Sequence, residues 1–569
     1  MKFSTFLTVA LVAGTEATFM TNPLEHLGAY MAADRMVPAP GQAPVSLLVE
    51  PPVLDGADWV TVSWQGLDEQ KSDDWVAAYL VTPKADLNLS ATSPFKYQWT
   101  KNGNETSKSS GQLKIHLLNM RHEVVFVFFR NGTQHPVAVA KSNPVSFQNY
   151  NEPLQAHLSL TEKEGEMRLT WVTKDAVHPM VRWRTQAERN FGASANASTT
   201  TYTRSDLCGA PATTIGFNDP GLIHTATMTN LPPATEIFYE YGDDSFGVAN
   251  ATFITPPPVS NSSTLQFYAF GDLGQAELDG TLEESEMLSS LGTTSLMSKM
   301  LESERVVVHI GDISYARGYV PQWDNFHHQI TPLATRMPWM TCIGNHERDW
   351  PNTASIYNGT DSGGECGVAY ERRFPMPRTR EDAPWYSFES GPVHFTLMST
   401  EHNFTQGSEQ WDFLSTDLSG VDRARTPWVV VGGHRPMYID STNYDKPAGD
   451  QTVATALRQE VEPLLIKHKV DLALWGHHHS YQRTCPVASS NCVAPLPSGS
   501  NAAPVHMVIG MAGAGNSRNI AKVRPAVFEY VDDLRHGFVR GRADGATLSM
   551  EYISNDEAGE VVDKLVLTK

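Results

Sequence analysis

The sequence predicts a protein of the mixed α/β class in which two all-β sandwich domains precede an α/β domain. Up to about residue 256, apolar residues come in short strand-like runs between Gly, Pro, Asn and Ser turns, with hardly a helical period among them. After residue 264, apolar runs alternate with segments compatible with helices, such as residues 282–303. With 569 residues, the chain is long enough for several domains with cores of their own.

Residues 1–17 have the features of a secretory signal peptide. One lysine precedes a short apolar stretch, and small residues follow it up to Ala17. No later segment offers about twenty uninterrupted apolar residues, which a membrane-spanning helix requires. We therefore expect a cleaved signal and a mature protein that is soluble, secreted and not held in a membrane.

Two features of the sequence agree with export. Cys485 and Cys492 enclose a short loop and are expected to form a disulfide, whereas Cys342 lies in an apolar run and is expected to be a buried free thiol. Cys208 and Cys366 are then left as candidates for a long-range pair. Eight N-x-S/T sequons are compatible with a glycoprotein, at Asn88, Asn104, Asn131, Asn196, Asn250, Asn261, Asn358 and Asn403.

The two β domains are predicted at residues 40–150 and 152–256. The first contains the runs WVTVSW, WVAAYLV and EVVFVFF. The second contains LQAHLSL, EMRLTWVT and MVRWRT and ends at the Pro-rich linker ITPPPVSNSS. Its segment NLPPAT and the following FYEYG resemble the corner before a late strand of fibronectin type III domains. Neither domain has an evident cluster of catalytic residue types, so we expect a scaffold or a lip that faces the substrate.

The α/β domain, residues 264–569, contains five apolar runs that each end in oxygen or nitrogen ligands. They are LQFYAFGDLG, RVVVHIGDISYARGY, PWMTCIGNHE, PWVVVGGHRPMY and VDLALWGHHHSYQR. In α/β sheets, ligands collect beyond the carboxyl ends of the strands, and a glycine before the polar residue lets the backbone turn closely. We therefore expect these side chains to meet: Asp272, Asp312, Tyr315, Asn345, His434, His477 and His479.

These residue types suit two different metal ions. Two ions about 3.5–4 Å apart need a bridging carboxylate, and such a pair can activate a solvent hydroxide and screen the charge of a phosphoryl group. Asp312 is the natural bridge. A hard trivalent ion favours the anionic oxygens of Asp272 and Tyr315, whereas a divalent ion is well served by Asn345 and imidazoles.

The histidine run at 477–479 has two interpretations. Neighbouring side chains of an extended segment point to opposite faces, so His477 and His479 can share a target that His478 cannot reach. A run of histidines can equally be a solvated turn. The oxygen and nitrogen ligands at the ends of the other predicted strands favour metal binding. Three further histidines are expected outside the site, His309 as a packed strand residue and His327 and His328 on a helix surface.

Together, GDLG, GDISYARGY, GNHE, GGHRPMY and GHHHSYQR resemble the motifs of the purple acid phosphatases, specifically their large plant-type members. The resemblance runs from about residue 40 to the C-terminus and includes YTRSDLCGAPAT and VHFTLMSTEH. It implies a four-layer αββα metallophosphoesterase sandwich. It also implies an Fe(III) ion whose charge-transfer band with a tyrosine gives the purple colour, and a divalent Zn, Mn or Fe ion. The implied Fe(III) ligands are Asp272, Asp312, Tyr315 and His479, and the implied ligands of the divalent ion are Asp312, Asn345, His434 and His477.

The expected function is that of a secreted acid phosphatase, in which hydroxide activated by the metals attacks the phosphorus of small phosphate monoesters. The alternatives are a phosphodiesterase or nucleotide pyrophosphatase with the same site, and a secreted binding protein with a vestigial metal site. The formal charge of −20 is spread along the chain without a long basic block, so neither nucleic acid nor an anionic membrane is an expected partner. The oligomeric state is not predicted.

Two residues beside the ligands are candidates for substrate binding. His346 follows Asn345 in GNHE, and the resemblance implies that it contacts the substrate phosphate. Relatives place further histidines after the strand that ends in His434, where this chain has RPMYIDSTNYD. We therefore assign phosphate binding to Asn345, His346 and Arg435, and protonation of the leaving group to His346. In the alternative interpretation, Arg435 forms a structural ion pair and His346 only orients a metal ligand.

Overall fold

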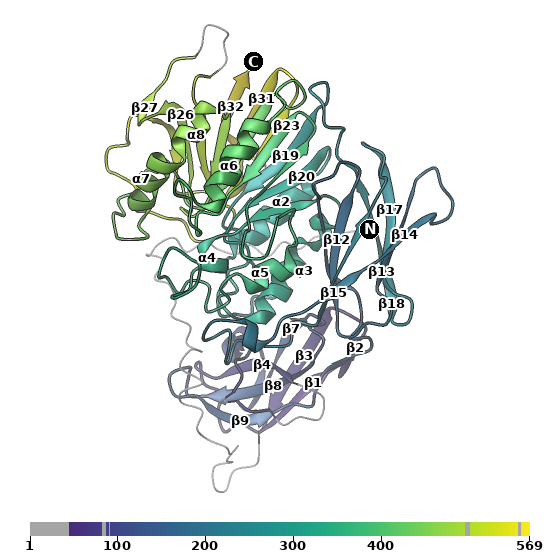
Figure 1. Cartoon of the computed structure of the whole chain (residues 1–569). Coiled ribbons are helices and arrows are strands. Elements are labelled where there is room, and N and C mark those ends of the chain that lie inside the picture. Colours follow the sequence, from purple (N-terminus) through teal and green to yellow (C-terminus); the bar gives the residue numbers. More distant parts are fainter. Residues whose placement is uncertain (1–44, 82–86, 90, 496–500, 556–558) are drawn as a thin grey trace.

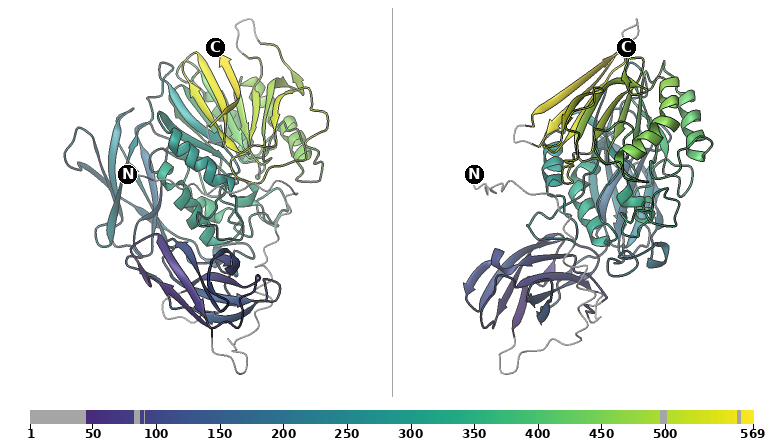
Figure 2. Two further views of the ribbon diagram at one scale, coloured as in Figure 1. Left: turned by 180° about the vertical axis from the view of Figure 1, so that it is seen from behind. Right: turned by 90° about the vertical axis from the view of Figure 1, so that its left-hand side faces the viewer.

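The computed structural model describes residues 45–81, 87–89, 91–495, 501–555 and 559–569. The N-terminal β domain lies at one end of the molecule and the last strands of the chain lie at the other, which all the views agree on (Figures 1 and 2). The predicted signal peptide lies outside the described residues. Within the described ranges, no helix is both long and apolar enough to cross a bilayer.

The first β domain is a sandwich of two four-stranded antiparallel sheets. Its elements are β1 (Ser46–Glu50), β2 (Val53–Leu54), β3 (Asp58–Gln65), β4 (Trp75–Val81), β5 (Lys96–Trp99), η1 (Thr100–Asn102), β6 (Asn104–Ser107), β7 (Ser110–Leu117), β8 (Glu123–Arg130), β9 (Val137–Lys141) and β10 (Ser146–Phe147). The sheet orders are β1-β3-β7-β6 and β5-β4-β8-β9, and β10 pairs with β2. Strands β4 and β8 are almost continuously buried, because a second cluster around Trp75 and Phe129 covers the outer face of their sheet.

The second β domain also has two four-stranded antiparallel sheets. Its elements are β11 (Leu154–Ser159), β12 (Met167–Thr173), β13 (Met180–Thr185), β14 (Ala193–Asn196), β15 (Ser198–Thr200), η2 (Arg204–Asp206), β16 (Leu222–Met228), β17 (Glu236–Asp243) and β18 (Gly247–Ile254). The orders are β11-β12-β16-β15 and β14-β13-β17-β18. The predicted all-β pattern is thus confirmed in both regions before residue 256.

Two sheets packed face to face form the centre of the α/β domain. One has the order β21-β20-β19-β30-β31-β32, and the other has the order β22-β23-β24-β25-β28-β26-β27 with β29 beside β26. The strands are β19 (Leu265–Phe270), β20 (Glu304–Ile310), β21 (Trp339–Cys342), β22 (Tyr386–Ser390), β23 (Val393–Leu397), β24 (Trp428–Gly433), β25 (Leu472–Trp475), β26 (Tyr481–Ala488), β27 (Asn491–Cys492), β28 (Val505–Ile509), β29 (Phe528–Asp532), β30 (Gly537–Ala543), β31 (Thr547–Ser554) and β32 (Val561–Thr568). Neighbours β19, β20 and β21 are parallel, as are β23, β24, β25 and β28.

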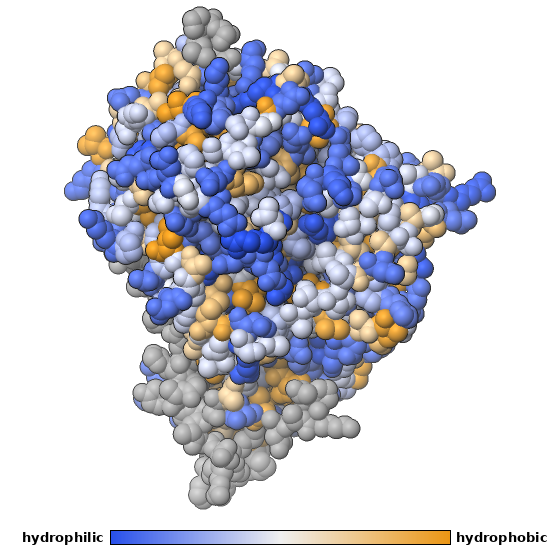
Figure 3. Space-filling model, in the orientation of Figure 1, coloured by the Kyte–Doolittle hydropathy of each residue, from blue (hydrophilic) through white to orange (hydrophobic). Residues whose placement is uncertain are grey.

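Helices cover the outer faces of the two sheets, which gives the expected αββα order. The helices are α2 (Ser289–Met300), α3 (Val320–Ala334), α4 (Asn345–Arg348), α5 (Val368–Arg373), α6 (Glu409–Gly420), α7 (Asp450–Glu460) and α8 (Glu462–Lys467). Strand β24 shows the two-sided packing: Val430 belongs to the core shared by the sheets, and Val429 and Val431 belong to the core beneath α6 to α8. On the face seen in Figure 3, hydrophilic side chains predominate over this domain and hydrophobic ones form small scattered groups.

The cysteine predictions are confirmed. Disulfides join Cys208 to Cys366 and Cys485 to Cys492, and Cys342 is a buried free thiol. The Cys208–Cys366 bond ties the second β domain to the segment that follows α4. The asparagines of all eight sequons are exposed.

Two details differ from the sequence predictions. His328 is exposed on α3 as expected, but His327 is buried because α3 packs against β11, where its ring stacks on that of His157 at 4.9 Å. Helix α2 begins at Ser289 rather than near residue 282, because Leu282 instead pairs with a strand of the first β domain. His309 is buried in β20 against Phe270, as predicted.

Candidate metal centre

All seven predicted ligands lie together where strands of the two sheets end. Asp272 follows β19, Asp312 and Tyr315 follow β20, Asn345 begins α4 after β21, His434 follows β24, and His477 and His479 follow β25. The carboxyl ends of parallel strands therefore converge here, as the sequence predicted.

The backbone turns sharply at these strand ends. The angle φ is 59°, 48°, 54° and 69° at Asp272, Asp312, Tyr315 and His477. Residues other than glycine rarely adopt this left-handed conformation, and it persists where the surrounding structure enforces it. The glycines before the ligands allow close approach. A Cβ on Gly476 would lie only 2.7 Å from Asp272 Oδ2, and one on Gly311 only 2.5 Å from His434 Nδ1.

The ligands form two groups that share Asp312. In the first group, Asn345 Oδ1 lies 2.9 Å from both His434 Nε2 and His477 Nδ1. Asp312 Oδ1 lies 3.2 Å from His434 Nε2. One ligand atom from each of Asp312, His434 and His477 lies within 4.8 Å of the others, which is the spacing of a site for one ion.

The second group contains the tyrosine. Tyr315 Oη lies 3.2 Å from Asp272 Oδ1 and 2.9 Å from His479 Nε2. Ligand atoms of Asp272, Asp312 and His479 also lie within 4.8 Å of one another. Since Asp312 belongs to both groups, it is placed as a bridge between two adjacent ion sites.

The orientation of the imidazoles fits bound cations. His434 Nδ1 donates to the carbonyl of Ile310 at 3.1 Å, and His479 Nδ1 donates to the carbonyl of Gly515 at 2.7 Å. With these protons on Nδ1, the Nε2 atoms point into the centre, where His434 Nε2 faces oxygens of Asp312 and Asn345 and His479 Nε2 faces the hydroxyl of Tyr315. Nitrogen and oxygen lone pairs that converge in this way need a proton or a metal ion between them, so this set of ligand atoms suits metal ions.

The pKa values in the centre report an excess of negative charge. Burial, together with the nearby Asp272 and Asp312, raises the pKa of the Tyr315 hydroxyl well above its usual value, so its ionisation would require a strong cation. Burial would lower the pKa of His434, but the carboxylates led by Asp312 raise it to about 10. A polyvalent cation would neutralise this field.

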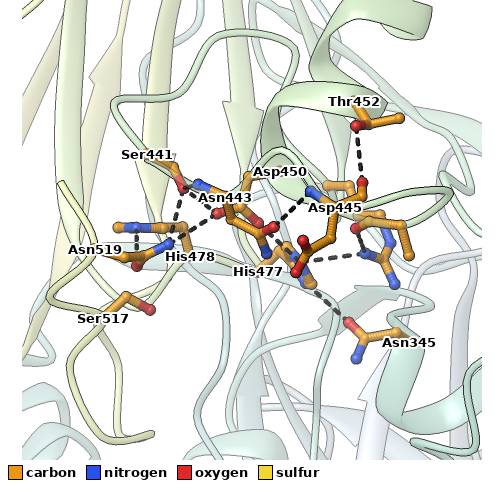
Figure 4. Close-up of polar contacts among 12 residues, drawn as sticks. Asn345, Ser441, Asn443, Asp445, Asp450, Thr452, His477, His478, Ser517 and Asn519 are labelled. Carbon is orange, nitrogen blue, oxygen red and sulfur yellow. Dashed lines mark hydrogen bonds and ion pairs between the residues drawn. The ribbon is translucent and has the colours of Figure 1, made fainter. Parts of the chain in front are cut away.

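The other nitrogen of His477 faces away from the centre. His477 Nε2 lies 3.5 Å from Asp450 Oδ1, and Figure 4 shows the ring between Asp450 and Asn345. Asn519 and Ser441 hydrogen bond to the other oxygen of Asp450. Groups that contact a metal-binding imidazole on its far side fix the orientation of the ring.

His478 does not join the metal ligands. It is buried, with Nδ1 2.7 Å from Ser480 Oγ and Nε2 3.1 Å from Asn519 Oδ1, and Figure 4 shows it on the far side of His477 from Asn345. The histidine run is therefore not a solvated turn, and its members divide between the centre and a separate polar pocket.

His346 borders both halves of the centre. Its ring lies 4.5 Å from that of Tyr315, its Nδ1 donates to the carbonyl of Asp361 at 3.1 Å, and its Nε2 lies 3.9 Å from Asp312 Oδ2. The carboxylate of Asp361 accepts from Asn345 Nδ2 at 3.2 Å, which leaves the amide oxygen of Asn345 to face the centre.

Arg435 is buried and bonded on all sides. Its Nε lies 2.9 Å from Glu401 Oε2, its Nη2 lies 3.0 Å from Asp349 Oδ2, and its guanidinium stacks on the ring of Tyr357 at 4.4 Å. Its Nη1 lies 3.2 Å from His477 Nε2. These are the contacts of the ion-pair interpretation of Arg435. Glu401 and Asp349 are not among the residues predicted from the sequence, although Glu401 lies in VHFTLMSTEH, after β23, and Asp349 lies two residues beyond GNHE.

Four family models match consecutive parts of the chain. They describe an Fn3-like domain from purple acid phosphatase at residues 49–149, a purple acid phosphatase N-terminal domain at 153–264, a calcineurin-like phosphoesterase at 265–481 and an iron/zinc purple acid phosphatase-like C-terminal region at 503–564. "Probable inactive purple acid phosphatase 27" of Arabidopsis thaliana is 36% identical over 529 residues, which cover 87% of this chain and 84% of the relative. The chain belongs to the purple acid phosphatase family.

One solved structure and one further relative by sequence are also similar to this purple acid phosphatase chain. The structure of the purple acid phosphatase PPD1 from yellow lupin seeds superposes with a TM-score of 0.84 at 31% identity, covering 92% of this chain and 96% of that one. A "Nucleotide pyrophosphatase/phosphodiesterase" of Hordeum vulgare is 33% identical over 327 residues, covering 56% of this chain and 86% of the relative. The names of these relatives thus span inactive, phosphatase and diesterase proteins.

Proposed function

We propose that the protein is a secreted acid phosphatase that hydrolyses small phosphate monoesters with an Fe(III) ion and a divalent Zn, Mn or Fe ion. The observation that carries this proposal is the convergence of all seven ligands, with their lone pairs directed inward and Asp312 shared between two groups. When bound, the two metals would activate water for attack on phosphorus and offset the charge that develops on the phosphoryl group. The two disulfides and the exposed sequons support secretion.

The residues of the chain would hold and position the substrate. We assign phosphate contact to His346 and to the amide of Asn345, which face the shared edge of the two ion sites. We assign Arg435 to positioning rather than to phosphate binding, because Glu401 and Asp349 already accept from its guanidinium. Its Nη1 reaches His477, so it supports that ligand from outside the centre.

Two other functions remain as alternatives. The Hordeum vulgare relative favours a phosphodiesterase or nucleotide pyrophosphatase, and the relatives named as probable inactive favour a binding protein with a vestigial site. The intact ligand set argues against the second, since loss of function removes the need to keep seven ligands oriented.

One purified sample separates these functions. We expect two metal ions per chain, at least one of them iron, a visible absorption band, and faster turnover of an aryl phosphate monoester than of the matching diester or a nucleoside diphosphate. Preferred turnover of the diester or the nucleoside diphosphate would replace the proposal by the first alternative. Two bound metals without hydrolysis of any of the three substrates would establish the second.

Tyr315→Phe tests the assignment of the trivalent ion. The change removes only the phenolic oxygen that lies beside Asp272 and His479, so we expect the visible band to disappear and iron binding to weaken. Visible spectra and metal content of the variant and the parent protein give the readout. An unchanged spectrum would show that Tyr315 is not the chromophore.

His346→Ala tests protonation of the leaving group. If His346 is the acid, alkyl phosphates with poor leaving groups should lose kcat far more than aryl phosphates, whose leaving groups depart without a proton. The measurement compares kcat for the two substrate classes at equal metal content. An equal proportional loss for both would assign His346 to positioning or charge stabilisation.

A further inference from the structure

The segment that follows Asp272 packs against the metal centre. Residues 275–287, which we call the acidic loop, join β19 to α2, and Met287 N donates to the Gln275 carbonyl at 2.8 Å to close the loop. Just before the loop, a Cβ on Gly274 would lie 2.2 Å from Met287 Cγ and 3.2 Å from Tyr315 Cδ2. Met287 of the loop and the ring of Tyr315 therefore both lie against Gly274, which has no room for a side chain.

The loop also supports the turn that carries Tyr315. With its amide turned so that both ends are satisfied, Gln322 donates to the carbonyls of Tyr315 and Ala316 at 3.1 and 3.0 Å. The oxygen of the same amide accepts from Glu284 N and Ser285 N at 3.2 and 3.0 Å. A shift of the loop would therefore be transmitted to Tyr315 both at its ring, through Gly274, and at its backbone, through Gln322.

The first β domain holds the far side of the acidic loop. Leu282 pairs with Tyr97 of edge strand β5 through two backbone hydrogen bonds of 2.8 and 2.9 Å, and Gln98 Nε2 donates to the Gly280 carbonyl. The side chain of Leu282 packs on the aromatic cluster of that domain, which includes Trp75. The loop thus extends the sheet of a domain that is distant in sequence.

Lys96 is the charged centre of this contact. It is fully buried, and its Nζ lies 2.8 Å from Glu277 Oε2, 3.3 Å from Asp279 Oδ2 and 2.7 Å from the His116 carbonyl. His116 N donates to the same oxygen of Asp279 at 2.7 Å. The ammonium therefore joins two side chains of the loop to the first β domain.

The acidic loop places four carboxyl groups near Lys96, those of Glu277, Asp279, Glu283 and Glu286. Burial, together with the nearby Glu277, raises the pKa of Glu283 well above its usual value and that of Glu286 to about 8, so Glu277 and Asp279 are the carboxylates that Lys96 neutralises. Buried carboxylates left without a cation are strongly unfavourable. Loss of Lys96 should therefore displace the loop rather than leave it in place.

We propose that the first β domain positions the metal centre: Lys96 holds the acidic loop, and the loop holds Asp272 and Tyr315 at the Fe(III) site. Lys96 and Gln98 are thus positioning residues for ligands in another domain. The inference rests on the proposed function, since it concerns the trivalent half of the proposed centre. The N-terminal sandwich, which has no evident cluster of catalytic residue types, would thus act by positioning ligands in another domain.

The test uses Lys96→Met in the full chain, with Lys114→Met as the control on an exposed site of β7. We expect iron affinity to fall by at least about ten-fold and the tyrosine–iron band to shift, because supporting residues typically change metal affinity by such factors. The divalent metal should be retained, and kcat should fall more than KM rises. The control should match the parent protein in every measurement.

A second variant guards against a folding defect. Gln98→Ala leaves no buried charge unpaired. We expect iron affinity, the tyrosine–iron band and kcat to change in the same direction as in Lys96→Met, but by less. Hydrogen exchange at residues 275–287 reports the loop without reference to metal or activity, and it should accelerate in both variants. Folded variants with parent-like exchange, iron affinity and spectrum would overturn the inference. If the parent protein binds no iron, the proposed function fails, and exchange at residues 275–287 and 313–316 alone decides whether Lys96 positions the ligand segments.

Discussion

Alanine at His477 or His479 is expected to remove nearly all of the proposed phosphatase activity, by at least about 100-fold in kcat/KM, because each change deletes a proposed metal ligand. The two variants should differ in the metal they lose. His479 Nε2 faces Tyr315, so His479→Ala should lose iron. His477 Nδ1 faces Asn345, so His477→Ala should lose the divalent ion. Steady-state kinetics on an aryl phosphate and elemental analysis of the same samples measure both effects.

His478 provides the matched control for this experiment. It is buried and hydrogen bonds Ser480 and Asn519, so His478→Asn is preferable to alanine because it keeps a polar group in the pocket. We expect most activity and both metals to remain, with some loss of thermal stability. Equal loss of activity in the variants at positions 477, 478 and 479, at equal folded fraction, would contradict the division of the histidine run.

The convergence of the seven side chains could be predicted from sequence because the position of each rests on a local rule. A buried parallel strand followed by a glycine and a polar residue identifies the carboxyl end of that strand. The strand topology then brings five such ends together. Asp312 and Tyr315 could be assigned in this way because both follow one strand within a few residues. The four-layer order followed from the family resemblance rather than from the pattern of elements.

The remaining features depend on contacts between distant segments. The first turn of the expected helix before Ser289 is a loop because Tyr97 pairs with Leu282, and no periodicity in residues 282–303 reveals that contact. His327 lies on a helix whose outer face another domain covers. The same limit applies to Arg435, whose partners Glu401 and Asp349 come from two other segments.

Arg435→Met is expected to destabilise the catalytic domain by about 3–5 kcal/mol, the typical cost of removing one partner of a buried ion pair. Arg435 is only 3% exposed, and its loss would leave Glu401 and Asp349 buried beside the centre without their cation. Denaturant unfolding followed by a catalytic-domain signal gives the free energy, and competitive inhibition by inorganic phosphate gives the affinity for the product.

The triple variant Arg435→Met, Glu401→Gln, Asp349→Asn separates the two roles of Arg435. It removes the cation together with both buried negative charges, so it should recover much of the lost stability if the ion pairs are the main role. Phosphate affinity should then change little in either variant, once the folded fraction is taken into account. If Arg435 instead binds the substrate, stability would change little in Arg435→Met, whereas phosphate inhibition would weaken in both variants and KM would rise. The guanidinium would then have to release Glu401 or Asp349 whenever phosphate binds.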